Sequence, residues 1–274
     1  MCKIGIVIYH QCPTDSIVCF SLPIYYSTIY ESVILLVTEH ARTVYKMFPY
    51  AYRNIKCNIL YIHSSEVLNT VQSIMNDENN KYEYLPHGIW YCNQHNNFIQ
   101  DKCLTTADEK YLAGSQYFYS NFTKYILDSK ICFNYFNVDR DIDLETTKYN
   151  EITKTIGSKY YIINAEQNKY NQDKIPSNIK HFNLDYSSET LFDMIMVIEN
   201  AYEIHLVSTF WSLIIYYLQN KYGLFSKINI YFHSYVRHGR LEGLYHEHGT
   251  LSNWTFYRCP ETCRENEHII SGIK

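Results

Sequence analysis

The chain has 274 residues, of which 46% are hydrophobic, and its formal net charge at pH 7 is −4. This length and apolar content are sufficient for one large core or for two modest domains. A mildly acidic chain lacks the basic field with which dedicated nucleic-acid-binding proteins attract phosphates, so we expect no nucleic-acid partner.

The cysteine content favours a reducing compartment. The nine cysteines are an odd number and their spacings form no dense disulfide framework, so we expect the cytosol. The first apolar run, 4–8, is too short for a signal sequence or a membrane span and predicts a β-strand. The 29 tyrosines and frequent Asn, Ile and Lys are typical of AT-rich genomes, including those of some large DNA viruses. For a viral protein, the host cytoplasm or the virion would be the location.

Strand and helix patterns alternate in the first half of the chain. Apolar runs predict strands at 3–9, 32–37 and 55–62. Helical patterns follow each of them, at 16–29 with an interruption at Pro23, at 39–47 and at 64–76. The polar region 76–106 carries turn signals and receives no assignment. The aromatic spacing within 108–127 predicts a helix that bridges the two halves.

The second half repeats this alternation. Strands are expected at 132–138, 159–163, 179–184, 204–207 and 227–232, and helices at 144–156, 190–200 and 211–219. The fold class is therefore α/β. We expect two facing Rossmann-like domains, an N-terminal one over 1–127 that includes the bridging helix and a C-terminal one over 128–274.

Two hydroxyls, Ser208 and Thr209, stand between the strand at 204–207 and an apolar helix. At such a junction the free N–H groups and the positive dipole of a helix N-terminus converge, and α/β proteins bind phosphates there. The alternative interpretation is that one of the two hydroxyls only caps the helix, which is the more frequent role.

Asp15 lies in the loop after the first predicted strand. A carboxylate at a strand's carboxyl end can act as a general base on a hydroxyl nucleophile. Capping of the next helix, together with Thr14, is an equally good interpretation. The chain has no Gly-rich phosphate loop, which disfavours both a Rossmann dinucleotide enzyme and a P-loop NTPase.

Arg140 stands in the predicted strand-to-helix turn of the second half, close to Asp141 and Glu145. An Arg in this position can donate two N–H groups to a phosphate while an acidic side chain holds its orientation. A solvated Arg in an acidic loop is the alternative. We expect this turn and Ser208–Thr209 to lie at the carboxyl ends of strands on one edge of a single sheet.

No segment predicts a metal site strongly. The run 246–248 (His-Glu-His) and the pair Cys259 and Cys263 match no standard tetrahedral zinc spacing. The alternating aspartates of 139–143 lack a second element that would complete a pocket, and they leave the use of a divalent cation open. We expect no resident metal or cofactor.

Taken together, several segments resemble glycosyltransferases of the two-Rossmann (GT-B) type from large DNA viruses and bacteria, which are distantly related to heptosyl- and fucosyltransferases. The matching segments are 10–47, which contains Asp15, then 118–145 with Arg140, and 192–210 with Ser208 and Thr209. The tripeptide 235–237 and the pair 253–254 (Asn-Trp) resemble the family's closing segment. The resemblance covers most of the chain through loose motifs.

The resemblance implies a central cleft in which the C-terminal half binds a nucleotide-sugar donor and the N-terminal half holds a glycan or other hydroxyl acceptor. Asp15 would be the catalytic base, and Arg140, Ser208 and Thr209 would bind the donor phosphates. A supporting set would comprise Asp141, Glu145, His205 and Arg237.

Two positions depart from the family pattern. Val207 replaces an acidic residue that commonly precedes the serine-rich turn, and Thr14 stands where a glycine often occurs. The resemblance as a whole implies a hexosyl- or deoxyhexosyl-type transferase that requires no metal and uses the nucleotide sugar as substrate. The alternative is a catalytically inactive GT-B-like protein that binds a nucleotide or glycan or serves as an interaction module.

Overall fold

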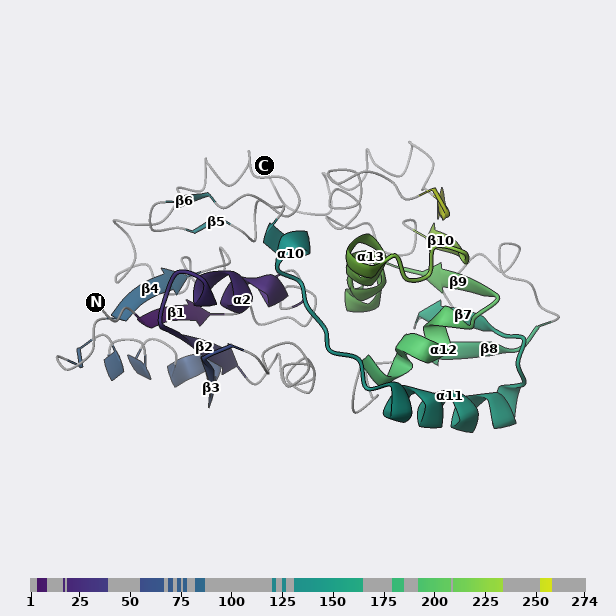
Figure 1. Ribbon diagram of the computed structural model, residues 1–274, viewed down its shortest axis with the longest axis horizontal. Coiled ribbons are helices and arrows are strands. Elements are labelled where there is room, and N and C mark those ends of the chain that lie inside the picture. Colours follow the sequence, from purple (N-terminus) through teal and green to yellow (C-terminus); the bar gives the residue numbers. More distant parts are fainter. Residues whose placement is uncertain are drawn as a thin grey trace.

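The protein is α/β, and its described residues form two parallel sheets and one small antiparallel pair (Figure 1). The computed structural model describes residues 4–8, 17, 19–38, 55–66, 69–70, 73–74, 76–77, 82–86, 120–121, 125–126, 131–164, 179–184, 192–207, 209–233 and 252–257. The predicted fold class is confirmed.

The N-terminal sheet has four parallel strands in the order β3-β2-β1-β4. They are β1 (Ile4–Ile8), β2 (Ser32–Thr38), β3 (Cys57–Ile62) and β4 (Tyr82–Pro86). The first three confirm the predicted strands. β4 comes from the region without an assignment, because its sequence YEYLP contains a Glu and a Pro and forms no continuous apolar run.

A helical crossover connects β1 to β2, as predicted for 16–29. It contains the 3₁₀ turn η1 (Cys19–Ser21) and the helix α2 (Leu22–Ser27). Pro23 lies in the first turn of α2, where its missing N–H would have no helical partner in any case. The expected helix at 64–76 begins as the 3₁₀ turn η3 (Ser64–Glu66), and the one at 39–47 lies outside the described residues.

Two predictions in the middle of the chain are wrong. Within the helix predicted at 108–127, the described residues form the antiparallel pair β5 (Ser120–Asn121) and β6 (Tyr125–Ile126). The strand predicted at 132–138 is instead the short helix α10 (Ile131–Asn134) followed by an irregular segment. Phe133 of α10 packs edge-on against a tyrosine of another helix, Tyr217. A short apolar run fits either environment, so its pattern alone cannot distinguish a strand from a helix.

The C-terminal sheet has five parallel strands in the order β11-β10-β9-β7-β8. They are β7 (Tyr161–Asn164), β8 (His181–Leu184), β9 (Glu203–Leu206), β10 (Asn229–His233) and β11 (Trp254–Tyr257). The first four confirm predicted strands. The connecting helical elements are α11 (Ile142–Ile156), η6 (Phe192–Met194), α12 (Ile195–Glu199) and α13 (Phe210–Tyr222).

Helix α13 is the most deeply buried helix among the described elements. Every residue from Phe210 to Gln219 is buried, which explains why this stretch is almost continuously apolar. The helix ends at Gly223, whose φ of 72° is the left-handed conformation that favours glycine after a helix.

β11 was not predicted, and side-chain amides hold it in place. Asn253 donates from Nδ2 to the carbonyls of Phe225 (2.9 Å) and Ile228 (2.6 Å). Its Oδ1 accepts from Gln219 (2.6 Å), whose Oε1 in turn accepts from the indole N–H of Trp254 (2.7 Å). These bonds tie the start of β11 to the end of α13 and to the loop that follows it.

Asn253→Ala should therefore lower the free energy of unfolding by about 2–4 kcal/mol, because it leaves several partly buried polar groups without their partners. Urea denaturation measures the change. Asn220→Ala is the matched control, since exposed Asn220 only bonds its own helix (2.9 Å to the carbonyl of Tyr216) and should cost less than about 0.5 kcal/mol. Equal effects of the two substitutions would contradict this role of Asn253.

Candidate functional site

The strand order of the C-terminal sheet reverses between β7 and β9. From β7 the chain goes to β8 on one side, and it then crosses to β9 on the other side and continues outward through β10 and β11. In open parallel sheets, ligands bind at the carboxyl ends of the strands at such a reversal, because the two adjacent crossovers diverge there. Asn164 ends β7, and Val207 and Thr209 follow β9, so these residues mark the candidate site.

A buried polar network occupies this edge of the sheet. The hydroxyl of Thr209 donates to Oδ1 of Asn164 at 2.5 Å, and Nδ2 of Asn164 donates to the carbonyl of Leu184 at 3.2 Å. Asn164 and Thr209 are both buried. The network joins the carboxyl ends of β9, β7 and β8, and fixes the backbone at the strand-order reversal.

Thr209 also caps helix α13. Its backbone N–H donates to the hydroxyl of Ser212 at 3.3 Å, and the two residues form a capping box. The capping interpretation of the hydroxyl pair therefore holds for Thr209, whose side chain is engaged by Asn164. The N-terminus of α13, with its positive dipole end, lies at the candidate site. Ser208 lies outside the described residues.

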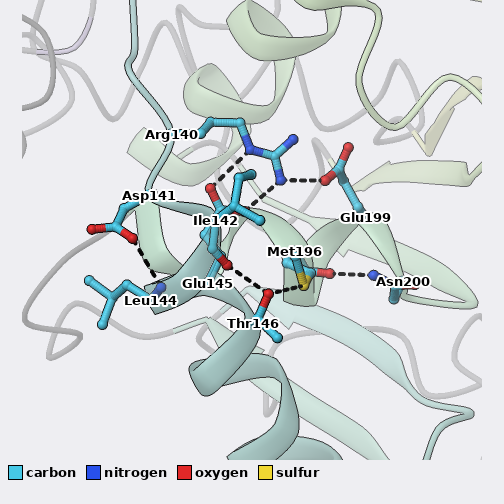
Figure 2. A network of polar contacts seen from close by, with 9 residues as sticks. All are labelled: Arg140, Asp141, Ile142, Leu144, Glu145, Thr146, Met196, Glu199 and Asn200. Atoms are coloured by element: carbon cyan, nitrogen blue, oxygen red, sulfur yellow. Dashed lines mark hydrogen bonds and ion pairs between the residues drawn. The ribbon is translucent and has the colours of Figure 1, made fainter.

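Arg140 occupies a different environment from the one expected. Its Nε donates to Glu145 at 2.9 Å, and its Nη2 donates to Glu145 at 2.5 Å and to Glu199 at 2.6 Å (Figure 2). The Glu145 side chain is only 1% exposed, against 24% for Arg140 and 27% for Glu199. The hydrogen bond with Glu145 is the largest cause that raises the pKa of the Arg140 guanidinium. An acidic side chain does orient Arg140, as expected, and two carboxylates bind its Nε and Nη2 groups.

The surroundings of Arg140 are acidic. Asp141 accepts from the N–H of Leu144 at 3.0 Å and so caps helix α11. Burial, followed by the charge of Asp141, raises the pKa of Asp193 to about 6. Two carboxylates against one guanidinium leave a net negative charge, which disfavours an additional anion at this position.

The predicted meeting of Arg140 with Thr209 at one sheet edge is not found. Because α10 replaces the expected strand, Arg140 follows no strand and instead leads into α11. Its partner Glu199 precedes β9, whereas Thr209 follows β9. The polar contacts described for the two residues have no partner in common.

His205 lies inside the sheet, in the middle of β9. Its Nδ1 shares a hydrogen bond with Nε2 of His233 on β10 at 3.0 Å, and its ring stacks on Tyr231 at 5.0 Å. Glu203 lies 3.8 Å from its Nε2. Burial lowers the pKa of His205 to about 4, so the ring is neutral at pH 7.

The other predicted site residues, Asp15 and Arg237, lie outside the described residues. Asn164 and His233 are polar residues at this sheet that the sequence reasoning missed. Asn164 is a polar residue at the end of an apolar strand. The same pattern, polar residues after an apolar strand, identified the hydroxyl pair after β9. His233 ends β10 and could have been found in the same way.

Within the described ranges, no group of three His, Cys, Asp or Glu side chains could hold a metal ion. The helices described there include none that is long and apolar enough to cross a membrane. No family model matches the chain, and comparisons with curated proteins and solved structures found no significant match.

The burial of Glu145 predicts unequal effects of removing the two partners of Arg140. Glu145→Ala should lower the free energy of unfolding by about 3–5 kcal/mol, because it breaks a buried ion pair. Glu199→Ala should cost about 1 kcal/mol, since Glu199 is more exposed. Urea denaturation gives both values, with Glu151→Ala as a control on an exposed i,i+3 pair. A Glu145→Ala cost no larger than that of Glu199→Ala would refute this assignment.

The lowered pKa of His205 predicts acid sensitivity. Because the folded state takes up this proton only near pH 4 and the unfolded state near pH 6.5, stability should fall as pH drops from about 6.5 to about 4. The raised pKa of Asp193, about 6, makes stability change with pH in the opposite direction. The effect of His205 is therefore isolated by comparing the wild type with His205→Gln. The variant should show a shallower loss of stability in urea titrations at pH 4.5–7. His181→Gln, at an exposed position, is the control. If the free energy of unfolding of His205→Gln depends on pH as that of the wild type does, His205 is not a source of the acid sensitivity.

Proposed function

We propose that the chain is a GT-B-type glycosyltransferase that moves a sugar from a nucleotide-sugar donor to an acceptor hydroxyl and needs no metal. In this proposal domains 1–127 and 128–274 face each other across a cleft, and the C-terminal domain binds the donor. The main support is the strand-order reversal of the C-terminal sheet, where the Asn164–Thr209 network and the N-terminus of α13 come together.

On the donor side, the N-terminus of α13 supplies positive potential for the diphosphate. The side chain of Thr209 is taken up by the cap and by Asn164, so we assign the phosphate-contacting hydroxyl to Ser208, its neighbour in the sequence. Arg237 follows β10, the strand beside β9, in the sequence, and we assign it as the candidate cation for the leaving group.

On the acceptor side, Asp15 follows β1 in the sequence, and the strand order of the N-terminal sheet reverses between β1 and β4. Asp15 would accept the acceptor's hydroxyl proton as that oxygen attacks the anomeric carbon. The bond from this carbon to the diphosphate oxygen breaks, and the nucleoside diphosphate leaves with the electron pair. The dipole of α13 stabilises the charge that develops.

One observation favours the second candidate, a nucleotide- or glycan-binding protein without transferase activity. Arg140, which the family resemblance assigns to the donor diphosphate, is held by two carboxylates in an acidic environment. In the transferase proposal Arg140 therefore positions helix α11 and contacts no phosphate. A loss of catalytic function would account for the same arrangement.

A panel of nucleotide sugars tests the proposal, with calorimetry for binding and release of nucleoside diphosphate for turnover. Asp15→Asn should lower kcat by about 100-fold or more while donor affinity is unchanged. Ser208→Ala should weaken nucleoside diphosphate binding by about tenfold, and Arg140→Ala should affect stability more than affinity.

Ser226→Ala is the matched control for the serine variant, because Ser226 is exposed in the turn after α13. Binding without turnover would support the second candidate. If no donor or nucleoside diphosphate binds, the transferase proposal is wrong, and so is the nucleotide-binding form of the second candidate.

A further inference from the structure

An aromatic junction connects the two parallel sheets. We define it as Phe20, Phe133, Phe136, Phe192 and Tyr217. Phe20 lies in η1, in the crossover between β1 and β2 of the N-terminal sheet. Phe192 lies in η6 and Tyr217 in α13, which connect strands of the C-terminal sheet. Phe133 lies in α10 and Phe136 in the segment after it, between these two sets of elements in the sequence. Figure 1 shows α10, which carries Phe133, between α2 and α13, and this helix contacts both.

The rings of the junction form a continuous chain of contacts. The ring of Phe20 lies 5.5 Å from that of Phe136 and 6.2 Å from that of Phe192. Phe136 lies 5.3 Å from Tyr217 in an edge-on arrangement. These four side chains are at most 2% exposed. The distances are those of favourable aromatic pairs, so the rings of the two halves pack as the interior of one domain does.

The segment that joins α10 to α11 is also held by polar bonds. The N–H of Val138 donates to the hydroxyl of Tyr222 at 2.9 Å, and Nζ of Lys221 donates to the carbonyl of Asn134 at 2.8 Å. Arg140 then anchors the end of the segment through Glu145. Residues 134–140 are thus attached to the C-terminal half at several points along their length.

The junction belongs to a single hydrophobic core. The same cluster of buried side chains includes Val33, Leu35 and Val37 of β2 and Ile204 and Ile230 of the C-terminal sheet. A contiguous cluster of this kind normally identifies one domain, so any cleft between the two halves would lie beside this shared core and would not divide it. If the two halves separated, completely buried rings of both would meet water.

We infer that the two sheets form one cooperative folding unit, and that the segment 134–140 is a fixed connection about which the halves do not rotate. This inference goes beyond the proposed function and does not depend on it. A donor or acceptor would then bind to a preformed arrangement of the two halves.

Hydrogen exchange of the intact protein in increasing, sub-denaturing urea, followed by mass spectrometry of peptides from β2 and from β9–β10, tests the inference. In the wild type, the slowest amides of both sheets should show the same opening free energy and the same urea dependence. An opening of β2 that leaves β9–β10 protected would overturn the inference.

Two substitutions outside the junction make the test reciprocal. Phe232→Leu in β10 should accelerate exchange of the slowest β2 amides about five- to tenfold, by the same factor as those of β9–β10. Leu35→Ala in β2 should accelerate exchange in β9–β10 and in β2 equally. Two independent domains would confine each effect to the sheet that carries the substitution, and that result would also overturn the inference.

Phe136→Ala should separate the two sheets by removing a ring that contacts both halves. The slowest β2 amides should then exchange faster than those of β9–β10. If this variant does not fold, Phe136→Leu with a smaller separation in the same direction replaces it. Continued equal exchange in a folded Phe136 variant would show that the junction does not couple the sheets.

Discussion

The burial of helix α13 is the constraint on which the described structure depends most. Its N-terminus is fixed by Thr209 at the strand-order reversal, its middle carries Tyr217 into the aromatic junction, and its end holds β11 through Gln219. Because this helix is buried from Phe210 to Gln219, it cannot move without disturbing the sheet, the junction and the candidate site together. A buried, close-packed helix of this kind has few alternative positions.

Electrostatics divides the C-terminal half into two regions with different capacities. At the carboxyl ends of β7 and β9, neutral amide and hydroxyl groups and a helix N-terminus create a setting that favours an anion. Around Arg140, carboxylates outnumber the guanidinium. Burial raises the pKa of the nearby Asp193 to about 6. An anionic ligand would therefore prefer the first region. The second region serves to hold the connection into α11.

The sequence predicted the features that depend on local pattern. Continuous apolar runs identified β2 and β9, and the hydroxyls after β9 identified the cap of α13, because burial and capping impose local residue choices. The same reasoning failed at α10, where an apolar run packs against α13 instead of pairing in a sheet. It also missed β4 and β11, whose short sequences YEYLP and WTFY contain polar residues and form no continuous apolar run.

By itself, the sequence determined the α/β class, the positions of β1 to β3 and of β7 to β10, and the hydroxyls that follow β9. Only the tertiary structure decided the partners of those residues. Glu199 reaches Arg140 from far along the chain, and Asn164 takes up the hydroxyl of Thr209. The order of the strands, and hence the place where it reverses, also came only from the fold. Such pairings depend on which distant segments meet, and no local periodicity encodes that choice.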